Sequence, residues 1–101
     1  MEEVLLSVVM TTYNHERYIA TAIESVLRQQ TDFRVEIVVG EDCSTDRTRA
    51  IVEDYQRMYP ECVRIVSSEE NVGWRKNYRR TIEAAKGKYV ALLVGDGYCA
   101  H

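Results

Sequence analysis

Three short polar segments of this sequence carry side chains that could bind a ligand, and each follows an apolar run. These segments are residues 11–15, 41–46 and 95–98. The carboxylates of Asp42 and Asp96 can accept hydrogen bonds or ligate a divalent cation, and the ring of Tyr13 can stack on a flat group. We therefore treat the three segments together as one candidate binding site.

Each of these side chains also has a purely structural interpretation. Asp42 and Asp46 lie between a strand-like run and a helical one, so they could equally cap the turn and the helix. Asp96 stands between two glycines, and because Asp-Gly is a frequent turn pair, its spacing alone favours a turn. Tyr13 could equally be a packing ring, and His15 is expected to be an exposed loop residue.

The apolar pattern predicts elements that would bring these segments together. Apolar, β-branched runs indicate strands at 4–11, 35–41, 63–66 and 89–94, and apolar residues at three- and four-residue steps indicate helices at 16–30, 48–59 and 74–85. Strands alternating with helices predict an α/β fold, with a parallel four-stranded sheet and three helices packed on its faces. The polar segments would then meet at one edge of the sheet, where open α/β sheets bind ligands.

The third predicted helix carries two kinds of residue. Tyr78, Ile82 and Ala85 form its expected packing face. A basic run that includes Arg75 and Arg80 either faces solvent or, less readily, contacts an anion such as a phosphate.

Composition narrows the function classes. The chain has 101 residues, enough for one domain, and its net charge of −3 argues against binding to nucleic acid. No apolar run approaches the ~20 residues of a transmembrane segment, and the acidic start does not resemble a signal peptide. Three cysteines without a Cys-x-x-Cys pair indicate reduced thiols, hence a cytoplasmic location. The chain contains neither a P-loop nor a Gly-x-Gly-x-x-Gly motif, and it has no Gly-x-Ser-x-Gly elbow.

Several motifs in order resemble those of the family 2 glycosyltransferases. They are residues 7–14, 23–30, 36–46, 71–73, Asn77, residues 84–90 and the pair Gly95-Asp96. This resemblance covers nearly the whole chain and implies a Rossmann-like GT-A fragment, with residues 1–101 as the amino-terminal, donor-binding half. It also implies a nucleotide-sugar donor, usually a UDP-sugar, bound with Mn2+ or Mg2+.

The resemblance assigns roles to individual residues. By position, Thr11 and Tyr13 resemble the residues that hold the uracil and ribose, and Asp42 resembles the aspartate that hydrogen-bonds the uracil. The loop from Asn71 to Arg75 resembles a further nucleotide contact. Asp96 resembles the remaining carboxylate of a metal-binding Asp-x-Asp motif. The implied reaction is displacement of the nucleoside diphosphate from the sugar by an acceptor hydroxyl.

Two departures from the family pattern keep other interpretations open. Val94 and Gly97 replace acids of the metal motif, and fewer carboxylates bind a hard cation more weakly. The chain also stops at His101, before the acceptor-binding half and its catalytic base, so we expect it to be inactive alone. The alternatives are a non-catalytic nucleotide- or protein-binding module and a receiver-type signalling domain with Asp42 as phospho-acceptor. An uncovered sheet edge further predicts a homo-oligomer.

Overall fold

The computed structural model describes residues 3–29 and 32–94 of the chain. Its elements follow the predicted alternation of strands and helices. They are β1 (Val4–Thr12), α1 (Ile19–Leu27), β2 (Arg34–Glu41), α2 (Thr48–Met58), β3 (Val63–Ser67), α3 (Trp74–Ala84) and β4 (Tyr89–Val94).

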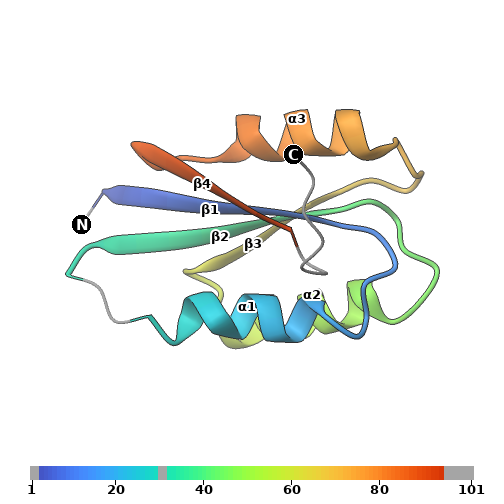
Figure 1. The fold of residues 1–101 in the computed structure, drawn as a ribbon, viewed down its shortest axis with the longest axis horizontal. Coiled ribbons are helices and arrows are strands. Elements are labelled where there is room, and N and C mark those ends of the chain that lie inside the picture. The colour runs from blue at the N-terminus through green and yellow to red at the C-terminus, as the bar shows by residue number, and fades with distance from the viewer. Residues whose placement is uncertain (1–2, 30–31, 95–101) are drawn as a thin grey trace.

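The four strands form one parallel sheet in the order β3-β2-β1-β4. Figure 1 shows α1 and α2 on one face of this sheet and α3 on the other. The predicted α/β fold class is therefore confirmed. The order also argues against the receiver-type domain, because in that fold β3 lies directly beside β1, whereas here β2 separates them.

The two faces of the sheet differ in chemistry. The face toward α1 and α2 is apolar and carries the hydrophobic core. Its fully buried members include Met10, Ile19, Ile23, Ile37 and Val39. Each such side chain removed from water stabilises the fold by about 1.5–3 kcal/mol, so this layer supplies much of the driving force for folding.

The face toward α3 is partly polar. The buried residues of α3 are Asn77 and Thr81, and the Asn77 amide donates a hydrogen bond to the Gly40 carbonyl of β2 (2.7 Å). A Cβ at Gly40 would lie 1.9 Å from Thr81 Oγ1, so the close approach of α3 to β2 requires glycine there. The predicted packing residues Tyr78, Ile82 and Ala85 are half-buried, whereas the fully buried side of α3 is the neighbouring one, which forms hydrogen bonds to β2.

A second buried polar cluster lies at the amino-terminal side of the sheet. The Glu36 carboxylate accepts hydrogen bonds from Ser7 Oγ, Arg64 Nε (2.9 Å) and the Lys86 backbone N–H (2.7 Å). Burial alone raises the pKa of Glu36, but the hydrogen bonds from Ser7, Lys86 and Arg64 outweigh it and hold that pKa below its ordinary value. This carboxylate thus joins three strands and the segment that follows α3.

Candidate functional site

The loops after β1 and β2 are fastened to each other at the carboxyl edge of the sheet. Asn14, in the left-handed region with φ of 55°, accepts the Thr45 N–H at its Oδ1 (2.8 Å) and donates its own N–H to Ser44 Oγ (2.9 Å). The His15 N–H donates to Thr48 Oγ1 (2.8 Å), and α1 begins at Ile19 rather than at the predicted residue 16. These contacts join two of the three segments that the sequence singled out.

Two of the acidic residues in this region have structural roles. Glu41 is fully buried, and its carboxylate accepts hydrogen bonds from the Cys43 N–H (3.1 Å) and the Ser44 N–H (3.0 Å). The Asp46 carboxylate accepts the Thr48 N–H at the start of α2 (2.9 Å). Burial raises the pKa of Asp46, but its hydrogen bonds to Thr48 and Glu16 lower it by more, so the carboxylate is held in its charged form. The capping interpretation therefore fits Asp46.

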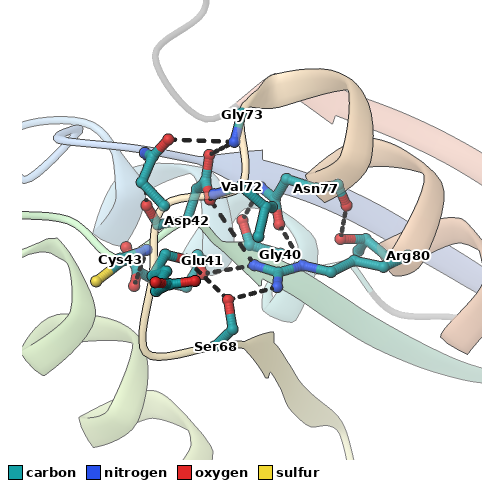
Figure 2. Close-up of polar contacts among 12 residues, drawn as sticks. Gly40, Glu41, Asp42, Cys43, Ser68, Val72, Gly73, Asn77 and Arg80 are labelled. Carbon is teal, nitrogen blue, oxygen red and sulfur yellow. Dashed lines mark hydrogen bonds and ion pairs between the residues drawn. The ribbon is translucent and has the colours of Figure 1, made fainter.

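Asp42 connects the end of β2 to the loop that precedes α3 (Figure 2). Its side chain is buried, and it accepts the Val72 N–H at Oδ1 (2.7 Å) and the Gly73 N–H at Oδ2 (3.1 Å). The Asn71 amide donates to the Asp42 carbonyl (2.9 Å). Gly73 has φ of 89°, a conformation that glycine adopts most readily, so the chain can turn sharply into α3. Asp42 thus joins the end of β2 to the turn that leads into α3.

Arg80 is a part of this region that the sequence interpretation missed. Its guanidinium donates to Ser68 Oγ (2.8 Å), to the Glu41 carbonyl (3.2 Å) and to Asn77 Oδ1 (3.0 Å), and it lies 3.9 Å from Asp42 Oδ1. Figure 2 shows this side chain reaching from α3 to the ends of β2 and β3. The sequence predicts a solvated face or an anion contact for this basic run, whereas Arg80 forms hydrogen bonds within the protein. The available signal was the helical spacing of Asn77, Arg80 and Thr81, which places all three on one side of α3.

A cavity of about 930 Å³ opens beside these loops. One part of its wall is polar and the other is apolar, and the apolar part comes from β1, β4 and α3. The polar wall comprises Thr11, Thr12, Tyr13, His15, Asp42, Asn71 and Asn77, and the apolar wall includes Val9, Trp74, Tyr78, Leu92 and Leu93. Four predicted site residues, Thr11, Tyr13, Asp42 and Asn71, therefore lie around one cavity.

The other predicted site residues are placed differently. Arg75 is absent from the residues that line the cavity, and its guanidinium carbon lies 5.3 Å from the centre of the Trp74 ring. Asp96 lies outside the described residues, as do Gly95 and Gly97. His15 is half-buried and lines the cavity, with Nδ1 3.0 Å from Thr12 Oγ1, so it is less exposed than expected.

The part of the chain that the structure describes does not fit a metal site. Among residues 3–29 and 32–94, no group of three or more His, Cys, Asp or Glu side chains could hold a metal ion. Asp42 is the one acidic residue in the described wall of the cavity, and its carboxylate already binds two backbone N–H groups.

Among residues 3–29 and 32–94, no helix is both long enough and apolar enough to traverse a bilayer.

Known proteins resemble this chain in both sequence and fold. TuaG of Bacillus subtilis (strain 168), named for a proposed role as a teichuronic acid biosynthesis glycosyltransferase, is 38% identical over 92 residues, which are 91% of this chain and 36% of TuaG. The crystal structure of S. aureus TarS 1–349 in complex with UDP matches with a TM-score of 0.78 and 34% identity over 92% of this chain and 28% of that chain. TarS 1–349 has also been solved in complex with UDP-GlcNAc.

A more distant structure has the same fold. The mannosyltransferase PcManGT from Pyrobaculum calidifontis, in complex with GDP-Man and Mn2+, matches with a TM-score of 0.79 at 23% identity, over 95% of this chain and 28% of that chain. At that identity the likeness concerns the fold alone, which is that of the GT-A glycosyltransferases. The chain spans only about a third or less of these proteins. The model of the family described as Glycosyl transferase family 2 matches residues 7–101, and the chain therefore belongs to that family.

Proposed function

We propose that this chain binds the nucleotide of a UDP-sugar, as the donor-binding part of a glycosyltransferase that transfers the sugar to an acceptor hydroxyl. The observation that supports this most directly is the cavity, which gathers Thr11, Tyr13, Asp42 and Asn71 at the carboxyl edge of the sheet. Uridine is the favoured nucleoside because TarS, which is 34% identical, has been solved with UDP and with UDP-GlcNAc.

The cavity residues suit a pyrimidine with an imino N–H. A carboxylate has about four acceptor positions, and Asp42 uses two of them for the Val72 and Gly73 N–H groups. The remaining positions can accept the imino N–H of uracil. The Tyr13 side chain is 42% exposed, which leaves its ring available for stacking on a ligand.

The chemistry assigned to the donor half is displacement of the diphosphate from the sugar. A divalent ion, Mn2+ or Mg2+, would supply charge neutralisation of the leaving diphosphate when bound. Its predicted ligand, Asp96, lies outside the described residues, and the described ones do not fit a metal. The chain spans 28% of the TarS chain, and the role that we propose for these residues is donor binding.

One structural feature favours the second candidate, a non-catalytic module that binds a protein or a bare nucleotide. Strand β4 lies at the edge of the described sheet, and its side chains Tyr89, Val90 and Leu92 are 57%, 44% and 54% exposed. Exposed apolar side chains on an edge strand are typical of a surface that contacts another chain. The two candidates differ in whether nucleotide binding depends on a divalent ion.

The test is calorimetric titration of the 101-residue chain with UDP, in the presence of Mn2+ and again with a chelator. We expect binding of UDP that Mn2+ strengthens, and weaker binding of GDP under the same conditions. The Asp42→Ala variant should lose about 1–3 kcal/mol of binding free energy, the cost of leaving a donor of the base unpaired.

A matched control is Asp54→Ala, which removes an exposed carboxylate from α2 away from the cavity. An affinity for UDP that is the same with Mn2+ and with the chelator would favour the non-catalytic module. Absence of UDP binding with and without Mn2+ would refute the proposed function.

A further inference from the structure

The positive charge of this chain is concentrated in one segment. Residues 74–88, which comprise α3 and its connection to β4, hold six of the 13 lysines and arginines but only one of the 16 acidic residues, Glu83. The net charge of −3 is therefore the sum of a basic segment and a strongly acidic remainder. Such an asymmetry creates a local positive potential, which the net charge of the whole chain does not indicate.

Three of these cations share the outer side of α3. The inner side carries the buried residues Asn77 and Thr81. Arg75, Lys76 and Arg79 are exposed, and their three- and four-residue spacing places them together on the side away from the sheet. Figure 1 shows α3 as the outermost layer on its side of the sheet, so no other described element covers these residues. We call Arg75, Lys76 and Arg79 the basic face of α3.

The basic face lacks the ion pairs that arginines form on the other two helices. At α1 and α2, three arginines that reach solvent each pair with a nearby acid of the same helix: Arg28 with Glu24, Arg49 with Glu53 and Arg57 with Asp54. Within residues 3–29 and 32–94, the cations of the basic face form no ion pair, and Glu83, four residues after Arg79, is not paired with it. The positive charge of this face is therefore not neutralised within the described protein.

This arrangement of charges is unfavourable for the helix itself. Arg79 lies four residues after Arg75 and three after Lys76, and like charges at these spacings destabilise a helix. Arg75 and Lys76 also lie in the first turn of α3, which contains no acid, and cations are disfavoured there by the partial positive charge of the helix N-terminus. A partner that brings negative charge to this face would relieve both effects.

An exposed aromatic ring borders the basic face. Trp74 is the first residue of α3 and is 69% exposed, and the guanidinium carbon of Arg75 lies 5.3 Å from the centre of its ring. An indole has an apolar body and one polar N–H, which suits the headgroup level of a lipid bilayer. The aliphatic stems of lysine and arginine can lie against apolar surface in the same way while their charges stay in water. Cations beside an exposed indole are thus typical of a helix that lies on a membrane.

The shape of this region also favours a flat partner. None of the three cations lines the cavity described above, and Figure 1 shows α3 running along the outside of the sheet. A soluble acidic peptide would pair with the cations but would leave the indole in water. Anionic lipids supply phosphate groups for the cations and, directly beneath them, a layer that accepts the indole. A membrane surface therefore accounts for both features of the face.

We propose that the basic face of α3, together with Trp74, is a docking surface for an anionic lipid membrane, on which the chain lies without crossing it. The attachment is weak and reversible, because it depends on few charges and one ring, and salt weakens it by screening those charges. This inference goes beyond the proposed function and does not rest on it. The docking surface faces away from the sheet and needs no bound nucleotide.

The test is sedimentation of the 101-residue chain with lipid vesicles. We expect the chain to sediment with vesicles of phosphatidylcholine that contain about 30% phosphatidylglycerol, and to stay in solution with phosphatidylcholine alone. Sodium chloride at about 0.5 M should release it. Because Trp74 is the single tryptophan, its emission should shift to shorter wavelength with the anionic vesicles and stay unchanged with the neutral ones.

Variants with matched charge locate the surface. Lys76→Glu combined with Arg79→Glu should weaken binding to the anionic vesicles about ten-fold or more. Arg28→Glu combined with Arg57→Glu changes the net charge by the same amount at exposed positions of the helices on the opposite face, and should bind within about two-fold of the unmodified chain. Trp74→Ala should also weaken binding. All five substituted side chains are exposed, so circular dichroism should show an unchanged fold.

Four results would overturn the docking surface. They are equal sedimentation with neutral and anionic vesicles, equal losses in the two charge-reversed variants, an unchanged affinity of Trp74→Ala, and tighter binding to polyglutamate or single-stranded RNA than to the vesicles. The last result would assign the basic face to a soluble polyanion. The two proposals stay separable, because absence of vesicle binding by a chain that still binds UDP would remove the docking surface alone. Vesicle binding without UDP binding would support it while refuting the proposed function.

Discussion

Replacement of Arg80 tests whether α3 positions the candidate site through buried hydrogen bonds. In Arg80→Ala the Glu41 carbonyl and Asn77 Oδ1 lose their guanidinium donor, and both residues are almost fully buried. A buried acceptor left without a donor costs about 1–3 kcal/mol. For the two acceptors together, the loss in the free energy of unfolding would be at most about 6 kcal/mol. The Arg80 side chain is 23% exposed, however, so water can reach part of the vacated space. We therefore expect a loss of about 2–3 kcal/mol in the free energy of unfolding.

The assay is urea denaturation followed by circular dichroism, with Arg79→Ala as the matched control. Arg79 lies on the same helix and carries the same charge, but its side chain is exposed, so its removal should change stability by less than about 0.5 kcal/mol. Arg80→Ala should also weaken UDP binding, because the guanidinium lies beside the Asp42 carboxylate. Equal stabilities of the two variants would refute the reasoning, since they would show that the Arg80 contacts contribute no more than a surface charge.

The remaining predictions concern the helix contact, a buried acid and the sheet edge. Gly40→Ala should destabilise the fold by about 2 kcal/mol or more, because the new methyl group would collide with Thr81 Oγ1, and adding Thr81→Ala should recover part of that loss in thermal unfolding. The folded state lowers the pKa of Glu36, so its contribution to stability is present above its ordinary pKa of 4.5 and lost as the pH falls through the folded value. The stability difference between the chain and Glu36→Gln should accordingly shrink in acid, and a difference independent of pH would contradict this. Within the described sheet, β4 has no partner strand on its outer edge, and this edge should make two copies associate. Leu92→Lys should therefore shift the mass found by sedimentation toward the monomer, whereas a monomeric parent chain would rule out this interface.

The strands and their parallel arrangement were predictable from sequence for a local reason. Runs such as Ile37-Val38-Val39 are β-branched and apolar on both sides, and only a strand covered on both faces buries them. Helices between such strands require crossovers, which place the loops after Thr12 and Glu41 at the same edge. The grouping of Thr11, Tyr13, Asp42 and Asn71 around one cavity follows from that topology, while their contacts with a nucleotide stay a prediction.

Sequence alone determined that acidic and aromatic side chains would gather at one end of a parallel sheet, because periodicity and chain order are local properties. The tertiary structure decided which of those groups hold the loops and which remain available. Glu41 and Asp46 bind backbone N–H groups, Arg80 reaches residues about 40 positions earlier in the chain, and Trp74 stays exposed beside the cavity. These roles depend on partners that are close in space and distant in sequence, and no local pattern of residue types specifies such a partner.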